Sequence, residues 1–474
     1  MLFPTIRFAL FFLVVLPLNW ALMPKPRLWK PFILVASFVF YCAFDWRLGF
    51  LLAASIVANW YFAETIRSVE GERAKKAVLT AAVAANLAVL GFFKYYGFFV
   101  SSVSGVSGAL GLGISAPIIT VALPIGISFF TFQALSYVID VFRNRFRTVS
   151  LVDFAVYLSF FPHVVAGPIV RASEFVPQLA EPADRRRVDA TRAFWLIAGG
   201  LFKKVVIASF LATAIVDEVF RAPGQFSSPD ILVAIVGYAV QIYADFSGYT
   251  DIAIGIALLL GFRFPQNFDR PYTAVNVQEF WHRWHMTLSR WLRDYLYIPL
   301  GGNRRGHVRM YVNLFATMLL GGLWHGAAWT FVFWGALHGT ALVVHHYRTS
   351  RREALGIEAV PITPARMWLA RLGTFSFVCL AWVFFRADSF GTAFDLLWRL
   401  LTAWGPARAV TPAVLVAIAV GLGAQFVPAG LGSRVLARVS RAAPIVQAVG
   451  LALALVVIDA FGPTGVMPFI YFQF

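Results

Sequence analysis

Two histidines lie within or beside apolar segments, where membrane proteins seldom carry ionisable residues. His285 closes the segment E-F-W-H-R-W-H at 279–285, and His325 lies in G-L-W-H-G at 322–326, inside a long apolar run. Hydrocarbon supplies no water to an ionisable group, so residues of this kind are usually functional. A neutral imidazole can take a proton from a hydroxyl or thiol and return it later, as acyl transfer requires. The spacing predicts a membrane-embedded reaction site; a helix-break histidine at 325 and a packing histidine at 285 are the alternatives.

The composition indicates a membrane protein rather than a soluble one. Of 474 residues, 59% are hydrophobic and 13% are charged, with a mean hydropathy of +0.73. Soluble proteins carry about 25% charged residues, so a soluble enzyme and a disordered tail protein are both excluded. The net charge of +17 is scattered at the ends of apolar runs, which indicates loops held at an anionic membrane surface rather than nucleic-acid binding.

Apolar runs of membrane-spanning length recur along the whole chain. They fall near 5–22, 31–45, 48–66, 76–93, 118–141, 151–168, 205–221, 230–262, 310–347, 367–386, 410–429 and 444–461. Some are too short, too long or too broken for simple spans, so we expect about 11 to 13 transmembrane and re-entrant helices. The fold class is an all-α polytopic membrane protein with one membrane-embedded domain, 1–474. Basic loops alternate with a Ser/Gly-rich loop at 94–117, which predicts an N-terminus outside the cell.

Two of these runs contain features that would interrupt a helix. The segment 151–171 carries Pro162, Gly167 and Pro168, which predicts a re-entrant hairpin with His163 lining its cavity. The run 230–262 is long enough for two helices, and A-D-F-S-G-Y-T-D at 244–251 is the expected break between them. Asp245 and Tyr249 in that break are either substrate contacts or parts of a structural hinge.

The residues around His285 predict one helix lying at the cytoplasmic interface. Arg283, Arg290 and Arg293 would then hold the phosphates of a donor or anchor lipid headgroups. Asp294 follows Arg290 by four residues and is a candidate salt-bridge partner. Trp324, beside His325, completes the candidate substrate-binding residues.

The other polar residues are weaker candidates for a catalytic role. Asn267, Asp269 and Arg270 are expected to order the cytoplasmic mouth, and His338, His345 and His346 to follow a helix that ends at the surface. Only His282-x-x-His285 and the pair His345–His346 recur at ligand spacing, so we expect no metal site.

Nine segments in order resemble the membrane-bound O-acyltransferase family. The resemblance is densest over 120–340, and closest to the bacterial branch of alginate O-acetyltransferase and the D-alanyl transfer protein of teichoic acids. Its segments are L-P-I-G-I-S-F-F-T-F-Q (123–133), F-F-P-H-V-V-A-G-P-I-V-R (160–171), Q-I-Y-A-D-F-S-G-Y-T-D-I-A-I-G (241–255), F-P-Q-N-F-D-R-P-Y (264–272), 279–285, R-D-Y-L-Y-I-P-L-G-G (293–302), 322–326, W-V-F-F-R-A (382–387) and F-I-Y-F-Q-F (469–474).

The resemblance implies helices around a central tunnel, in a multi-pass protein of the bacterial inner membrane. It makes His325 the family's invariant histidine and His285 its second, cytoplasmic-side histidine. The donor would be a cytoplasmic acyl thioester such as acetyl-CoA, with no bound cofactor, and the acceptor a secreted polysaccharide or an extracytoplasmic acetyltransferase. His282 departs from relatives, which usually carry arginine or another residue there, so which imidazole of this segment faces the tunnel stays open.

Two rival functions follow from the same residues. A D-alanyl transferrer would differ only in taking its acyl group from a carrier protein. A proton-coupled transporter of polysaccharides or small molecules would use the histidines as a proton relay. Such transporters usually show internal repeats, and none is evident here.

Overall fold

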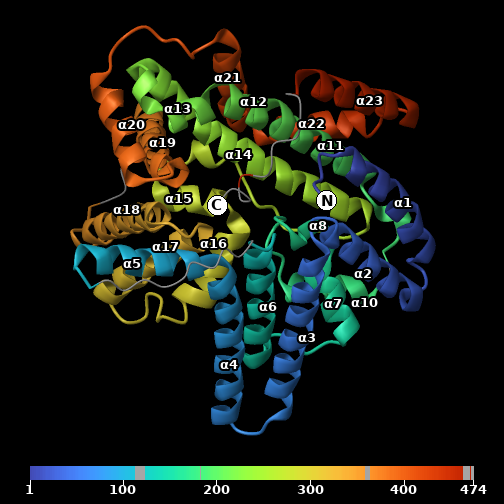
Figure 1. The fold of residues 1–474 in the computed structure, drawn as a ribbon. Coiled ribbons are helices and arrows are strands. Elements are labelled where there is room, and N and C mark those ends of the chain that lie inside the picture. Colours follow the sequence, from blue (N-terminus) through green and yellow to red (C-terminus); the bar gives the residue numbers. More distant parts are fainter. Residues whose placement is uncertain (113–122, 182, 358–362, 463–469, 471–474) are drawn as a thin grey trace. The chain divides into compact units, whose positions relative to one another are not determined.

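The structure is a computed structural model that describes residues 1–112, 123–181, 183–357, 363–462 and 470. This described part contains helices and no β-strand, which confirms the all-α fold class (Figure 1). The start of the predicted run 118–141, and the closing motif 469–474 apart from Ile470, lie outside the described residues. The chain divides into two compact units, Met1–Ala190 with Ile256–Pro265, and Thr191–Gly255 with Gln266–Phe474.

Several helices are suited to crossing a membrane. Within the described ranges, six are long and apolar enough: Trp46–Ser68, Glu72–Ala109, Ala190–Arg221, Ser228–Leu259, Pro364–Arg386 and Pro444–Phe461. Two shorter apolar helices, Ile6–Leu22 and Ile127–Phe142, accompany them. The chain is therefore a multi-pass membrane protein. The predicted 11 to 13 elements also include short and re-entrant helices, which these six long helices of the described residues do not represent.

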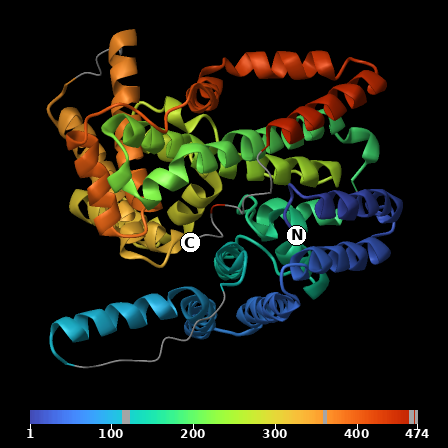
Figure 2. The ribbon, with the colours of Figure 1, turned by 45° about the horizontal axis from the view of Figure 1, so that its top comes forward.

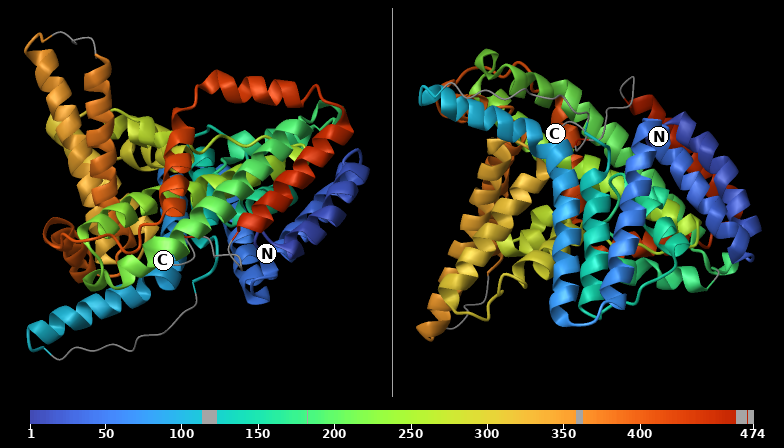
Figure 3. Two further views of the ribbon diagram at one scale, coloured as in Figure 1. Left: turned by 90° about the horizontal axis from the view of Figure 1, so that it is seen from above. Right: turned by 60° about the horizontal axis from the view of Figure 1, so that its bottom comes forward.

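The first unit is built from the N-terminal helices. They are α1 (Ile6–Leu22), α2 (Pro26–Cys42), α3 (Trp46–Ser68), α4 (Glu72–Leu90), the π-helical turn η1 (Gly91–Tyr95), α5 (Tyr96–Ala109), α6 (Ile127–Phe142), α7 (Leu151–Ser159), α8 (Phe161–Val164), α9 (Ala172–Phe175) and α10 (Pro177–Ala180). Helices α3, α4 and α6 lie side by side (Figures 1 and 3). The prediction of a loop over 94–117 is wrong for residues 94–109. These residues are helical, because η1 leads directly from α4 into α5.

The segment 151–171 forms no spanning helix, as its prolines predicted. Helix α7 has nine residues and α8 has four, with the break at Phe160. His163 in α8 is fully buried, and its Nε2 lies 2.7 Å from the backbone oxygen of Tyr157. Phe175 and Phe264 flank the imidazole at ring distances of 5.7 and 5.3 Å. The broken backbone thus packs within protein, the setting in which irregular backbone is tolerated at membrane depth.

The second unit holds both candidate catalytic histidines. Its helical elements are α11 (Ala190–Leu201), η3 (Phe202–Ala208), α12 (Ser209–Leu211), η4 (Ala212–Val216), α13 (Asp217–Arg221), α14 (Ser228–Leu259), α15 (Val277–Arg283), α16 (Met286–Leu292), η7 (Arg293–Tyr297), α17 (His307–His325), α18 (Trp329–Ala354), α19 (Pro364–Arg386), α20 (Phe390–Thr402), α21 (Pro412–Phe426), α22 (Ala429–Val439) and α23 (Pro444–Phe461). Helices α18 and α19 lie side by side, in orange in the left panel of Figure 3.

Helix α14 runs unbroken through its polar stretch, so the predicted break at 244–251 is wrong. Asp245 pairs with Lys204 and Asp251 pairs with Lys203, both lysines lying on the π-helical η3. Figure 2 shows α14 beside the segment that contains η3. A Cβ on Gly200 would lie 2.6 Å from the backbone oxygen of Gly248, so the two backbones touch. Because partner lysines satisfy the carboxylates, the helix does not need to open there.

Helices α17 and α18 form a close-packed hairpin. A Cβ on Gly322 would lie 2.3 Å from the backbone oxygen of Phe331, and one on Gly335 would lie 2.4 Å from that of Met318. Only glycine permits this backbone-to-backbone contact. The hairpin fixes His325, the last residue of α17, against the side chains of α18.

We expect Gly322→Ala to destabilise this hairpin. The added methyl group would overlap a backbone oxygen that cannot rotate away, and overpacking of this kind costs about 1–3 kcal/mol. The measurement is thermal unfolding of the detergent-purified protein. Gly373→Ala on α19 is the matched control, since a Cβ there meets nothing within 4 Å. Equal unfolding temperatures for the two variants would contradict the prediction.

Candidate active site

His325 closes α17 in a defined tautomer. Its Nδ1 lies 2.6 Å from the backbone oxygen of Gly321, and a carbonyl oxygen can only accept, so Nδ1 carries the hydrogen. In the neutral ring Nε2 then presents a lone pair. The side chain is 3% exposed, and its ring contacts those of Trp324, Trp334 and Phe385 at 5.0, 4.9 and 5.5 Å. This orientation suits a general base.

His285 lies at a sharp break between α15 and α16. The single helix predicted here is wrong, because α15 ends at Arg283 and His285 takes a left-handed conformation, φ 40° and ψ 54°, as the N-cap of α16. His285 is fully buried, whereas His282 is exposed. Non-glycine residues held at positive φ cluster at functional sites. Of the two imidazoles in this segment, His285 is therefore the one inside the protein.

Asn267 fixes the tautomer of His285. Its Oδ1 lies 3.1 Å from Nδ1 of His285 and also accepts from the backbone N–H and the hydroxyl of Thr287, at 3.2 and 2.9 Å. The Thr287 amide can only donate, so the amide oxygen of Asn267 faces it and Nδ1 of His285 must be protonated. Nε2 of His285 is buried and has no hydrogen-bond partner among the described residues. In this tautomer Nε2 carries the lone pair of the neutral ring.

The two imidazoles share one region of the second unit. Burial, and secondarily the imidazole of His325, hold the pKa of His285 well below its ordinary value; His285 lies outside the six candidate spans. Trp324 contacts both rings, at 5.0 Å from His325 and 6.2 Å from His285. Phe246 of α14 meets His285 edge-on at 4.7 Å. Two imidazoles whose Nδ1–H is each held by an oxygen thus lie near one another among aromatic rings.

We expect Asn267→Asp to shift the acidic limb of the pH–rate profile to higher pH. The carboxylate keeps the acceptor geometry but stabilises the imidazolium, so the pKa of His285 rises. The Nε2 lone pair of His285 can orient the donor side only while the ring is neutral, so activity is then lost at a higher pH as the solution is acidified. Transfer rates between pH 5 and 9 test this, with Asn276→Asp, an N-cap position on α15, as the control. An unshifted acidic limb would exclude His285 as a titrating group in the reaction.

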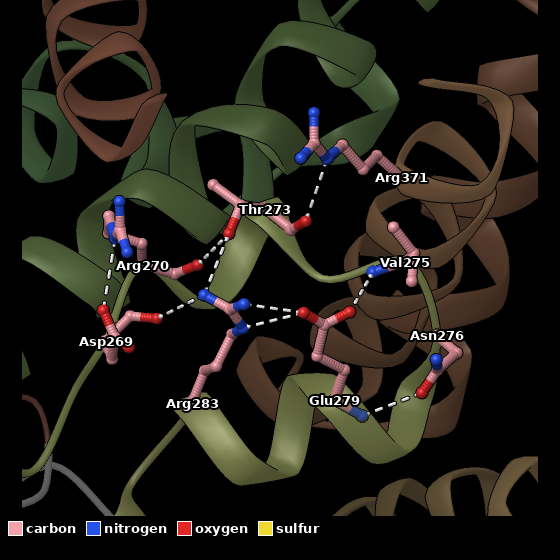
Figure 4. A network of polar contacts seen from close by, with 8 residues as sticks. All are labelled: Asp269, Arg270, Thr273, Val275, Asn276, Glu279, Arg283 and Arg371. Atoms are coloured by element: carbon pink, nitrogen blue, oxygen red, sulfur yellow. Dashed lines mark hydrogen bonds and ion pairs between the residues drawn. The ribbon is translucent and has the colours of Figure 1, made fainter. Parts of the chain in front are cut away.

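Arg283, the last residue of α15, is held in a polar network with the segment that precedes this helix (Figure 4). Its Nε and Nη2 donate to one oxygen of Glu279, at 3.1 and 2.7 Å. Nη1 lies 3.4 Å both from the backbone oxygen of Asp269 and from the hydroxyl of Thr273. The other oxygen of Glu279 accepts the backbone N–H of Val275 at 2.8 Å. This guanidinium therefore orders the turn that leads into α15, and its predicted contact with donor phosphates or lipid headgroups stays a prediction.

The remaining predicted binding residues lie on several elements. Arg293 is largely exposed and bonds its neighbour Asp294, with Nε 2.7 Å from Oδ1. Arg290 lies half-buried on α16. Tyr249 on α14 is fully buried. Asp245, besides its ion pair with Lys204, accepts the backbone N–H of Ile470 at 2.8 Å.

Sequence reasoning missed two residues of α18. His338 was expected near the surface, but it is fully buried, because α15 and α19 cover the middle of α18. Its Nδ1 accepts the indole N–H of Trp281 at 3.2 Å, which places the ring hydrogen on Nε2. Trp334, one turn earlier, is also fully buried. No sequence signal distinguished these two from ordinary packing residues. In the part of the chain that the structure describes, no group of three or more His, Cys, Asp or Glu side chains could hold a metal ion.

Known proteins resemble this chain across the segments just described. The MBOAT, membrane-bound O-acyltransferase family, matches residues 122–386, which include His285 and His325. The probable alginate O-acetylase AlgI of Azotobacter vinelandii is 42% identical over 78% of this chain and 71% of its own length. The peptidoglycan O-acetyltransferase of Helicobacter pylori is 36% identical, covering 78% and 73%. The teichoic acid D-alanyltransferase of Streptococcus thermophilus is 27% identical, covering 55% and 68%. The chain belongs to the membrane-bound O-acyltransferase family, and it is an O-acyltransferase.

Proposed function

We propose that this protein moves an acetyl group from a cytoplasmic thioester, acetyl-CoA, across the bacterial inner membrane for O-acetylation of a secreted polysaccharide such as alginate. One observation carries the proposal: His325 and His285 lie together with each Nδ1–H held by an oxygen, so both Nε2 atoms are set as acceptors. The relatives named alginate O-acetylase, near 40% identity, support acetyl as the acyl group. Both compact units would serve a single acyltransferase domain, 1–474.

His325 is the proposed general base. Its Nε2 takes the proton of the incoming hydroxyl as that oxygen attacks the thioester carbonyl, and later returns it to the departing thiolate. The hydroxyl belongs to the polysaccharide or to an extracytoplasmic acetyltransferase that passes the acetyl group on. His285 would orient or protonate the donor side. The thioester is a substrate, and no bound cofactor enters the reaction.

Other residues are proposed to guide the substrates. Arg283, Arg290 and Arg293, with Asp294 beside them, would form the cytoplasmic mouth that meets the phosphates of the donor. Trp324 contacts both imidazoles and would line the acyl path. Further contacts are proposed for Asp245, Tyr249 and His163.

Inverted membrane vesicles from the native host test the function. With radiolabelled acetyl-CoA outside, we expect alkali-labile label on the polymer or on a partner protein. Two rivals make different predictions. A D-alanyl transferrer would label its acceptor only from a D-alanyl carrier protein, and a transporter would move polymer without consuming any thioester. Transfer from the carrier protein alone, or polymer movement without thioester cleavage, would overturn the proposal.

A further inference from the structure

Helix α18 carries a buried hydrogen-bond donor with no partner in the described ranges of the chain. Trp334 is fully buried, and its indole Nε1–H bonds to no protein atom there. A buried donor left unsatisfied is destabilising, and native proteins rarely contain one. The indole N–H is therefore available to donate to a ligand that reaches this position.

Trp334 lies directly against the proposed base. Its ring meets the ring of His325 edge-on, with centroids 4.9 Å apart and planes at 70°. Trp382 stacks on Trp334 with ring centroids 5.6 Å apart and planes at 17°, and Phe385 packs on it at 5.1 Å. The following residue, Gly335, makes the close backbone contact with α17. The indole is thus held in place before any substrate arrives, as a transition-state donor should be.

The proposed reaction forms an oxyanion that needs a hydrogen-bond donor, and neither histidine can supply it. When the hydroxyl oxygen bonds to the thioester carbon, the carbonyl electron pair moves onto its oxygen and the proton moves to Nε2 of His325. The oxyanion needs a fixed donor until the C–S bond breaks and the thiolate takes that proton. The N–H of His325 is already bonded to Gly321, and that of His285 to Asn267. The donor must therefore be another group, and the indole N–H of Trp334 lies on a ring that contacts His325.

We propose that the indole N–H of Trp334 donates to the oxyanion of the tetrahedral intermediate formed at His325. This inference rests on the proposed function and adds a catalytic residue to it. Trp334 contributes no proton to the chemistry, since it donates the same hydrogen bond before and after the C–S bond breaks. Its effect is confined to the transition state and the intermediate.

Trp334→Phe tests the donor in membranes of the native host. The ring contacts largely remain, but the N–H is lost, so we expect kcat with acetyl-CoA to fall about 10²- to 10³-fold while KM stays near its parent value. A second variant replaces Trp334 with β-(benzothiophen-3-yl)alanine, which keeps the size of indole and lacks only the donor. It should lose as much kcat as Trp334→Phe with no change in unfolding temperature.

Trp281→Phe is the matched control. Trp281 is buried 5.7 Å from Trp334, but its indole N–H already bonds to His338 within the protein. Its loss should lower stability and leave kcat unchanged. Parent kcat in the benzothiophene variant would overturn the inference. His325→Ala separates the two proposals: if that variant keeps its activity, the proposed function fails, whereas an inactive His325→Ala beside a fully active Trp334 variant refutes the indole donor alone.

Discussion

We expect His325→Ala to abolish acetylation of the secreted polymer while the protein remains inserted and abundant. General-base catalysis contributes about 10²- to 10⁴-fold to a rate, and the rings of Trp324, Trp334 and Phe385 that pack on His325 cannot take a proton in its place. His325→Gln is the more stringent variant, because its amide can still donate to the Gly321 oxygen but cannot take a proton. Acetyl content of the isolated polymer and initial rates in vesicles measure the loss.

His282→Ala provides the control for this experiment. It removes an exposed imidazole from the same part of the sequence as His285, so insertion and activity should both be kept. Membrane abundance is compared by immunoblot in all three variants. Acetylation at the parent level in His325→Gln, with equal abundance, would remove His325 from the mechanism.

The second large effect is expected at the buried pair of Lys204 and Asp245. The two side chains are 1% and 8% exposed. Asp245→Ala leaves the ammonium of Lys204 without its counterion, and breaking a buried pair in this way costs about 3–5 kcal/mol. Phe246, next along α14, packs on His285, so the site should be disturbed together with the fold. Thermal unfolding in detergent and vesicle assays measure the two losses.

Two comparisons make this prediction specific. The neighbouring pair Lys203–Asp251 is 24% and 30% exposed, so Asp251→Ala should destabilise the protein far less, because water can still reach the lysine. The double variant Lys204→Met with Asp245→Leu removes both charges and should recover most of the stability. If the double variant regains stability and activity, Asp245 is a structural residue. Regained stability without activity would instead assign Asp245 to substrate contact. Equal losses for Asp245→Ala and Asp251→Ala would contradict the burial argument.

Two errors in the sequence-based prediction share one cause, which is a partner far along the chain. The stretch 244–251 looked like a helix break because two carboxylates in an apolar run seemed unsatisfied, but Lys203 and Lys204 satisfy them. The segment around His285 looked like one helix because its polar and apolar residues alternate suitably. Asn267, 18 residues earlier, instead holds His285 in a left-handed turn. Helical periodicity carries no information about either partner.

The sequence by itself determined the solvent, the all-α class and the two histidines worth testing. Those properties follow from local composition, since each apolar run and each ionisable residue within it can be judged against hydrocarbon alone. Only the tertiary structure decided which nitrogen of each imidazole is protonated, that His285 rather than His282 is buried, and that Trp334 keeps an unused donor against His325. Tautomers and unpaired donors depend on oxygens and rings contributed by other helices, and only the packed fold brings these groups within hydrogen-bonding distance.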